Sequence, residues 1–315
     1  DDRRAGARVG PDGLEYPPVW CVLFNLTSKD KRLRALFNEK DFRVAMSLAA
    51  NRDEMREMIE DGLGNNRQYC PPAASPFYYE KLAKAYLDYD PDRANALLDG
   101  LGLTERDAEG YRLWNDGSKE RVSFIDLMYF SENAGPHDLM LIDYYKAVGI
   151  EMIYRGLDRQ LSREMISANE VDVEVHDFDR TLVPLADPVH WIKTGNKNER
   201  PWCSAWTLWA MDNNDPNGEK PPEGHWIWDI WAAWEELQRT VGEENQKQVF
   251  WKILDIWAEQ LPVVGLYGDR PLQMVVKSGF KGIREGYPYE CCSTSYEYIM
   301  ESATWFWDDP AKHTA

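Results

Sequence analysis

Polar and aromatic residues stand where two predicted strands end, and such positions can hold a small molecule in an α/β protein. His176 and Asp177 lie near the end of an alternating stretch at 171–178, and Tyr129 and Phe130 end another apolar stretch. The carboxyl ends of parallel strands share one edge of a sheet, where open α/β folds bind their ligands. We therefore expect these four side chains to line a ligand-binding site. For Asp177 the alternative is a solvated or helix-capping carboxylate.

Tryptophan is concentrated between positions 191 and 257, which hold 10 of the 14 indoles. Four of these, Trp231, Trp234, Trp251 and Trp257, lie on the apolar faces of predicted helices, where core packing is expected. Trp202, Trp206 and Trp209 instead follow an irregular stretch, at i, i+4 and i+7 spacing. Flat amphipathic rings make good platforms for sugar rings and good anchors in general. For these three residues, a ligand platform and a core stripe are equal alternatives.

The sequence contains no motif for metal, nucleotide or nucleophilic chemistry. Its five histidines and five cysteines are scattered, without the spacing of a zinc site. It has no phosphate-binding loop and no Gly-x-Ser-x-Gly elbow, so neither nucleotide hydrolysis nor an α/β-hydrolase mechanism is supported. We expect no cofactor, no metal and no catalytic residue. The alternative from another class is a carbohydrate-active hydrolase, because 54 acidic residues guarantee a carboxylate pair somewhere.

Charge and hydropathy limit the partners of this chain. Lys and Arg number 36 against 54 Asp and Glu, which gives a formal net charge of −18. Such an acidic surface repels phosphate backbones, so we expect no nucleic-acid partner. No apolar run in the sequence reaches the length of about 18 residues that a membrane-spanning helix needs.

The elements that must position these residues alternate between helix and strand. Between 138 and 178, two predicted helices alternate with two predicted strands, which is typical of a parallel sheet with right-handed crossovers. The expected fold class is therefore α/β, with a mainly parallel sheet flanked by helices. Elsewhere we predict strands at 19–26, 111–114, 121–130, 261–267 and 272–276, and helices at 41–59, 227–237 and 249–257.

One further helix carries its own start and stop signals, at 91–99. Asp90 is a good amino-terminal cap, and Pro91 suits the first helical position because its missing N–H has no partner there. Gly100 is expected to end the helix in the left-handed conformation.

Four blocks of sequence resemble a known family when they are taken in order. They are Phe24-Asn25, residues 41–52 (DFRVAMSLAANR), Tyr89-Asp90-Pro91 with residues 94–99 (ANALLD), and residues 256–267 (IWAEQLPVVGLY). Each block alone is weak, whereas their shared order and spacing are specific. Together they resemble the family 5 extracellular solute-binding proteins of ABC importers. That family includes oligopeptide, dipeptide, nickel and some oligosaccharide binders.

The resemblance extends over roughly residues 19–285 and implies one lobe of the type II periplasmic-binding-protein fold. On this basis we assign 1–18 to a linker and 19–261 to the carboxyl-terminal solute-binding lobe. Residues 262–315 are assigned to a hinge crossing and a tail that returns toward the other lobe. Most of the family's amino-terminal lobe is expected to be missing from this chain.

The resemblance implies a binding protein and not an enzyme. Such a protein captures a solute between two lobes, closes around it by a hinge motion, and delivers it to ABC permease subunits in the membrane. The implied location is periplasmic or extracellular, in association with the membrane of the cell envelope. Asn25, in the first matching block, joins the expected ligand-binding residues.

The resemblance also bears on the class of solute. Peptide-binding members carry a Trp-x-x-Asp-Tyr-x-Asp-Pro-like motif whose acid meets the amino terminus of the peptide. Here the corresponding stretch, 175–179, reads VHDFD, and residues 218–223 (GEKPPE) resemble a branch associated with sugar uptake. We therefore expect an oligosaccharide in preference to an oligopeptide.

A chain with little of one lobe has a further expected consequence. Good small-molecule sites bury roughly 70–90% of the ligand surface, and half a cleft buries much less. We expect these 315 residues alone to bind solute weakly. We also expect them to self-associate through the cleft side or the tail, because uncovered apolar patches tend to find partners.

Overall fold

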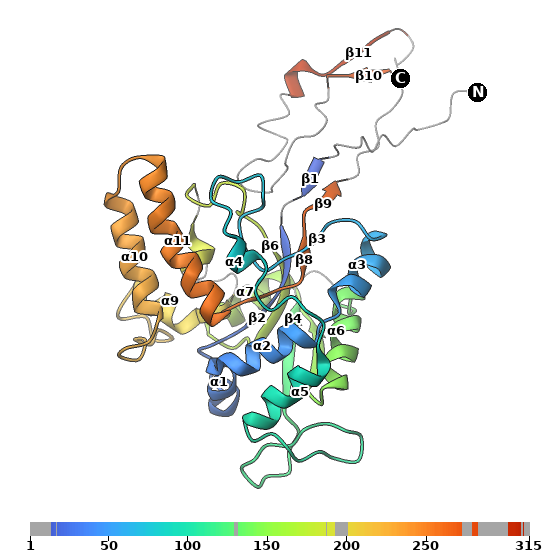
Figure 1. Cartoon of the computed structure of the whole chain (residues 1–315), viewed down its shortest axis with the longest axis vertical. Helices are drawn as coiled ribbons and strands as arrows, with labels where there is room; N and C mark the ends of the chain where they lie inside the picture. Colours follow the sequence, from blue (N-terminus) through green and yellow to red (C-terminus); the bar gives the residue numbers. More distant parts are fainter. Residues whose placement is uncertain are drawn as a thin grey trace, which may run out of the picture.

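The computed structural model describes residues 14–16, 18–128, 132–186, 188–192, 201–272, 279–282, 302–309 and 311. Its centre is a five-stranded sheet in the order β5-β4-β6-β2-β7 (Figure 1). β4 pairs in parallel with β5 and β6, whereas β2 pairs antiparallel with β6 and β7. Four strands therefore point the same way and β2 runs against them, which confirms the mainly parallel sheet. The strands are β2 (Val19–Phe24), β4 (Ser123–Met128), β5 (Glu151–Gly156), β6 (Val173–Phe178) and β7 (Val264–Gly265).

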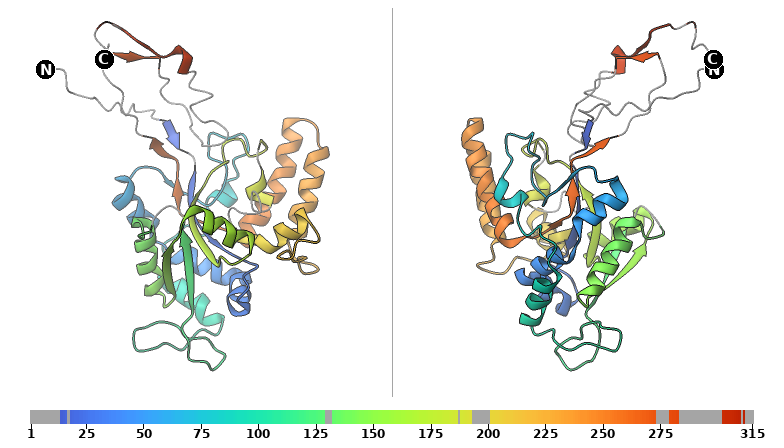
Figure 2. Two further views of the ribbon diagram at one scale, coloured as in Figure 1. Left: turned by 180° about the vertical axis from the view of Figure 1, so that it is seen from behind. Right: turned by 45° about the vertical axis from the view of Figure 1, so that its right-hand side comes forward.

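Helices cover both faces of this sheet (Figures 1 and 2), as predicted. The first face carries α1 (Lys31–Asn38), α2 (Lys40–Ala49) and α6 (Pro136–Ala147), with α5 (Pro91–Gly100) against α2 and α3 (Arg52–Glu60) against α6. The second face carries α7 (Arg159–Ser167), α8 (Val189–Ile192), the short η1 (Pro201–Cys203), α9 (Ser204–Met211) and α11 (Glu243–Gln260). α10 (Ile227–Arg239) and α4 (Glu80–Ala83) pack on α11.

Aromatic side chains fill the space between the layers on both faces. On the first face, the ring of Phe24 lies 5.2 Å from that of Phe37 and 5.7 Å from that of Phe124. On the second face, Trp191 stacks on Tyr69 at 4.0 Å. Aromatic pairs of this kind contribute beyond their buried area, so both layers are firmly joined to the sheet.

The predicted helix at 41–59 is two helices, α2 and α3. Ala50 between them is extended, and the side chain of Asn51 caps α3 by accepting a hydrogen bond from the Glu54 N–H. Apolar periodicity continues across this break because both helices pack against the same core, so the pattern alone did not reveal it.

The helix predicted at 91–99 is confirmed as α5, with Asp90 accepting from the Arg93 N–H and Pro91 in the first turn. The left-handed glycine that follows the helix is not the predicted Gly100. Gly100 is still helical, and Gly102 takes the left-handed conformation at φ +82°. Because glycine has no Cβ, it adopts this conformation without strain.

Part of the predicted linker 1–18 is a strand. β1 (Leu14–Tyr16) pairs antiparallel with β9 (Arg270–Leu272), and the two leave the lobe together (Figures 1 and 2). Its partner lies at the other end of the chain, and a three-residue strand shows no periodicity, so local sequence could not predict it.

The other predicted strands are shorter in the structure. The stretch 261–267 holds β7 and the start of β8 (Tyr267–Gly268), which pairs with β3 (Asn65–Asn66), and 111–114 forms only isolated bridges. Most of the predicted strand 272–276 lies outside the described residues. The remaining elements are β10 (Phe280–Lys281), η2 (Ser302–Thr304) and β11 (Phe306–Trp307).

Two buried arginines join the first helices to the chain that leaves the lobe. Arg43 donates to the carbonyl of Leu261 at 3.0 Å. Arg52 donates to the carbonyl of Gly265 at 2.8 Å and to the carbonyl of Ser47 at 2.7 Å. Burial lowers the pKa of both guanidinium groups to about 10, which still leaves them charged at neutral pH. The planar guanidinium groups of Arg43 and Arg52 thus hold the segment 261–265 against α2.

A buried carboxyl on β4 makes stability depend on pH. Asp126 is fully buried; its Oδ1 accepts from the Val175 N–H at 2.9 Å, and its Oδ2 has no hydrogen-bond partner among the described residues. Burial raises the pKa of Asp126 well above its ordinary value, and the nearby acids Asp138 and Glu174 raise it further. The native state therefore binds a proton that the unfolded chain releases more easily.

Asp126→Asn is expected to stabilise the protein at pH 8 more than at pH 5. A raised folded pKa gives stability that is present at low pH and is lost as pH rises above the unfolded value, and asparagine cannot ionise. Urea denaturation of the variant and the wild type at both pH values measures this difference. The exposed Asp143→Asn is the control and should show a difference that does not change with pH. Equal effects of Asp126→Asn at both pH values would contradict the account.

Candidate functional site

One edge of the sheet gathers the carboxyl ends of β4, β5, β6 and β7, and β1 and β9 leave the lobe from the same edge. Four side chains, which we call the carboxyl edge, lie there: Trp20, His137, Asp177 and Tyr267. Trp20 lies opposite Asp177 in the antiparallel β2–β6 pair. His137 is in the first turn of α6, just after β4, and Tyr267 begins β8.

These side chains come from distant segments and contact one another directly. The Trp20 indole and the His137 imidazole stack with centroids 3.9 Å apart and an interplanar angle of 23°. The Nε2 atom of His137 lies 2.5 Å from the Tyr267 hydroxyl, and their rings are 5.8 Å apart. Trp20 and Asp177 are half-buried, whereas His137 and Tyr267 are buried, so the indole and the carboxylate line the edge and the other two side chains pack behind the indole.

Burial keeps the imidazole at this edge neutral. Burial, with a smaller contribution from the Arg270 cation, lowers the pKa of His137 to about 4, whereas Asp177 acts in the opposite sense. Burial also raises the pKa of the Tyr267 phenol, with the Glu60 carboxylate contributing. Arg270 and Glu60 form an ion pair at 2.6 Å. At neutral pH the buried imidazole and phenol are therefore uncharged, and they lie between a carboxylate and an ion pair.

A second cluster follows the end of β6. Arg180 Nη1 lies 2.8 Å from His190 Nε2, so the ring proton of a neutral His190 is on Nδ1, which faces the Tyr69 hydroxyl at 3.5 Å and Asp179 Oδ1 at 3.9 Å. The Tyr69 hydroxyl donates to the carbonyl of Asp179 at 2.8 Å. Arg180 itself has φ +66°, a strained conformation that these contacts hold in place.

Of the predicted site residues in the helix–strand block, Asp177 lies at the carboxyl edge, with about a quarter of its side chain exposed. His176 points to the opposite face of β6 and is buried, although its Nδ1 is 2.8 Å from Asp177 Oδ1. Tyr129 and Phe130 lie outside the described residues.

Asn25 lies at the opposite end of the sheet from Asp177. In the β2–β6 register, Phe24 faces Val173 while Val19 faces Phe178, so the two ends are about 17 Å apart. The eight predicted residues are therefore not brought together at one edge. Sequence could not show this, because the direction of β2 relative to β6 is set by the tertiary fold.

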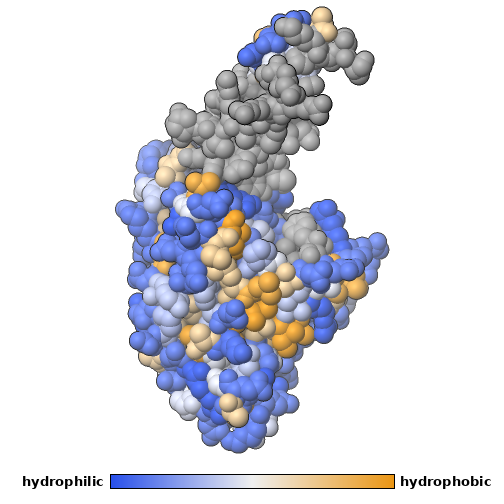
Figure 3. Space-filling view, turned by 90° about the vertical axis from the view of Figure 1, so that its right-hand side faces the viewer, coloured by the Kyte–Doolittle hydropathy of each residue, from blue (hydrophilic) through white to orange (hydrophobic). Residues whose placement is uncertain are grey.

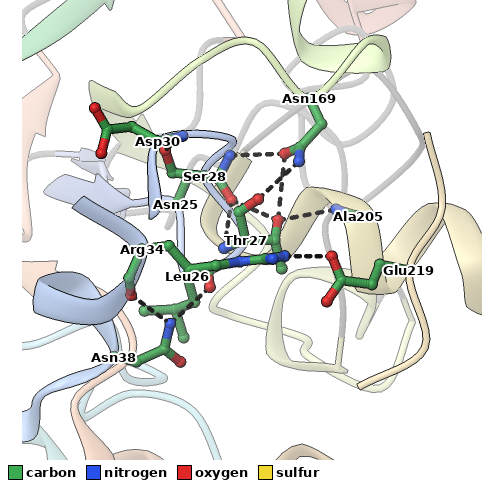
Figure 4. A network of polar contacts seen from close by, with 10 residues as sticks. All are labelled: Asn25, Leu26, Thr27, Ser28, Asp30, Arg34, Asn38, Asn169, Ala205 and Glu219. Carbon is green, nitrogen blue, oxygen red and sulfur yellow. Dashed lines mark hydrogen bonds and ion pairs between the residues drawn. The ribbon is translucent and has the colours of Figure 1, made fainter. Parts of the chain in front are cut away.

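Asn25 holds a buried polar network together (Figure 4). Its Nδ2 donates to Asn169 Oδ1 and to the carbonyl of Val171, both at 2.8 Å, and its Oδ1 accepts from the Thr27 hydroxyl at 2.7 Å. The Thr27 hydroxyl oxygen in turn accepts from the Ala205 N–H at the start of α9 at 3.0 Å. This arrangement joins the end of β2, the turn before β6 and α9, so it is structural in character.

The three tryptophans predicted as a platform or a core stripe belong to the layer on the second face. Trp202 and Trp206 are fully buried, and Trp209 is half-buried. The ring of Trp202 meets that of Trp257 edge-on at 5.4 Å. This burial favours the packing alternative for Trp202 and Trp206.

Sequence reasoning missed Trp20, His137 and Tyr267. A weak signal existed for two of them, because His137 follows the strand that ends near 128 and Tyr267 ends the apolar stretch 261–267. Trp20 carried no signal, since it lies at the start of its strand and reaches the edge only because β2 is antiparallel.

No group of three or more His, Cys, Asp or Glu side chains that could hold a metal ion occurs in the described part of the chain. Among the same residues, no helix combines the length and apolarity required to cross a bilayer.

Comparison with known proteins identifies the family. The model for bacterial extracellular solute-binding proteins, family 5 (middle part), matches residues 7–199. This chain belongs to the family 5 extracellular solute-binding proteins of ABC importers. A search of curated proteins gave no match.

Solved structures with the same fold cover most of this chain. An oligopeptide-binding protein OppA is 25% identical with a TM-score of 0.77, over 94% of this chain and 48% of its own. MelB from Agrobacterium fabrum in complex with stachyose is 13% identical with a TM-score of 0.70, over 91% and 45%. AppA from Bacillus subtilis in complex with a nonapeptide is 14% identical with a TM-score of 0.65, over 94% and 51%. The chain thus spans about half the length of these proteins.

Proposed function

We propose that this chain is part of the substrate-binding component of an ABC import system, and that its carboxyl edge forms one wall of the solute site. The observation that carries the proposal is the Trp20–His137 stack, which lies beside Asp177 at the edge from which β1 and β9 leave the lobe. Ligands bind outside the carboxyl ends of strands in open α/β sheets, so this edge is where a solute would be held.

We propose an oligosaccharide as the solute. Aromatic faces pack on the C–H faces of sugar rings, while carboxylates and neutral donors at their rim hydrogen-bond to hydroxyl groups. The edge combines these features, because the half-buried Trp20 indole, stacked on the buried His137, gives an aromatic face and the partly exposed Asp177 gives an acceptor beside it. MelB, which has the same fold, was solved with stachyose.

An oligopeptide is the second candidate. Asp177 could accept a peptide amino terminus through a charge-assisted hydrogen bond. The protein OppA, at 25% identity, is described as oligopeptide-binding. The two candidates use this carboxylate differently, since a peptide amino terminus would form an ion pair with Asp177, whereas sugar hydroxyl groups would donate charge-assisted hydrogen bonds to it.

Isothermal titration calorimetry on the full-length protein separates these candidates. We expect stachyose to bind with a dissociation constant on the order of 1 µM, equivalent to about 8 kcal/mol, and a nonapeptide to give no heat of binding. Micromolar binding of the nonapeptide with no response to stachyose would favour the oligopeptide alternative and contradict our proposal.

The remaining steps follow from the family. The solute would be enclosed by a second lobe through a hinge motion, outside the cytoplasmic membrane, and the closed form would dock on permease subunits. The hydrolase alternative is tested separately, because turnover of labelled stachyose by the pure protein would establish catalysis.

A further inference from the structure

The free edge of the central sheet carries exposed apolar side chains between charged ones. Within the described residues β5 pairs with β4 alone, so its other side has no neighbouring strand. Ile153, in the middle of β5, is 44% exposed, and Leu161 on α7 is 46% exposed. Figure 3 shows the side of the molecule that carries α3 and α6, and apolar side chains gather near its middle. Unpaired strand edges with apolar side chains are ready templates for another strand.

The helix above this edge adds to the same surface. Ile166 of α7 is buried in a small cluster on the second face of the sheet, with Leu127. On one side of the Ile166 contact, α7 carries a row of polar side chains that includes Arg163, and this row borders the loop at Asn217. By the helical period, Leu161 therefore projects to the other side, toward the β5 edge. Ile153 lies on this same face, because it is in register with Ile125 of the cluster.

The charges of β5 specify what can pair with it. Glu151, Ile153 and Arg155 alternate along the strand and share one face. In an antiparallel pair centred on Ile153, Glu151 of each copy faces Arg155 of the other, and Ile153 faces itself. Opposite charges directly across strands stabilise the pair, whereas like charges destabilise it. A strand with this pattern is complementary to itself, as a two-fold interface requires.

We propose that β5 is a homodimerisation edge, where a second copy of this chain adds its own β5 antiparallel to form a continuous sheet across the two-fold axis. The axis runs perpendicular to the sheet, so both α7 helices lie on one face and their Leu161 side chains flank the seam. Glu151 is already oriented by its ion pair with Arg121 at 2.8 Å. Six paired residues and a short apolar seam make a small interface, so the dimer is weak and reversible.

This inference is independent of the proposed solute. It also differs from association through the cleft side or the tail, because β5 is a side edge of the sheet and belongs to neither.

Sedimentation velocity on the 315-residue chain and two charge variants tests the proposal. Wild type is expected to be partly dimeric at about 100 µM. Arg155→Glu places two pairs of facing carboxylates at the seam, and Glu151→Arg places two pairs of facing guanidinium groups there. Each variant alone should dimerise at least about tenfold more weakly. An equimolar mixture should recover wild-type association, because every cross-strand pair is then of opposite charge.

Two matched controls locate the surface. Met58→Lys on α3 and Phe306→Lys on β11 change other exposed apolar residues and should leave association unchanged. A monomeric wild type at about 100 µM overturns the proposal. An Arg155→Glu variant that associates as strongly as wild type also overturns the proposal, and it does so whatever the effect of Phe306→Lys. A mixture that stays monomeric, although both variants keep the wild-type melting temperature, overturns it as well.

Discussion

Replacement of Arg52 by methionine is expected to lower the free energy of unfolding by about 3 kcal/mol or more. Its guanidinium is fully buried and donates to the carbonyl of Gly265, to the carbonyl of Ser47 and to the Ser47 hydroxyl at 2.7 Å. Methionine fills much of the volume and donates to none of these oxygens, and a buried acceptor left without a donor costs about 1–3 kcal/mol. Lysine at this position should also destabilise, because a point charge cannot reproduce the planar fork.

Urea denaturation of Arg52→Met, Arg52→Lys and the exposed Arg93→Met measures this effect. The midpoints should fall in the order Arg93→Met, Arg52→Lys, Arg52→Met. An Arg52→Met variant within about 0.5 kcal/mol of Arg93→Met would show that the fork contributes little, since surface changes are usually that small.

Much of the architecture could be predicted because local hydrophobic periodicity and helix caps determine it. The alternation from 138 to 178 gave α6, β5, α7 and β6 in the right order, and the caps at Asp90 and Pro91 gave α5. The direction of β2 could not be predicted, because a continuous apolar run such as 19–26 is typical of parallel strands, whereas β2 is an antiparallel strand that is buried on both faces. That direction decides which of its residues reach the carboxyl edge.

The candidate site was harder to predict for the same reason. Asp177 was found because a strand end marks the edge of a parallel sheet. Trp20 and Asn25 lie at opposite ends of β2, and the sequence pointed to the one that packs inside the lobe. Trp202 and Trp206 have the spacing of a helical stripe, which is the same for a platform and for a core layer, so only burial separates the two. Residue type and spacing therefore located β6 as one strand that contributes to the carboxyl edge, but they did not identify the other side chains that assemble there.

Loss of solute binding is the second large effect that we expect. Trp20→Ala removes the aromatic surface that stacks on His137, and Asp177→Asn removes the carboxylate opposite it in the β2–β6 pair. Truncation of a central aromatic anchor or removal of a charged hydrogen-bond acceptor costs about 1.5–3 kcal/mol each, which is about tenfold to a hundredfold in affinity. The double variant should lose at least about a hundredfold in affinity for the solute if both side chains contact it.

The most direct measurement of the central claim is calorimetry of stachyose binding to the full-length protein and four variants. Trp20→Ala and Asp177→Asn should each weaken binding by about tenfold or more. The matched changes away from this edge, Trp114→Ala before β4 and the exposed Asp143→Asn on α6, should stay within about threefold of wild type. If stachyose binds and the edge variants bind it as tightly as these controls, the carboxyl edge is not the solute wall.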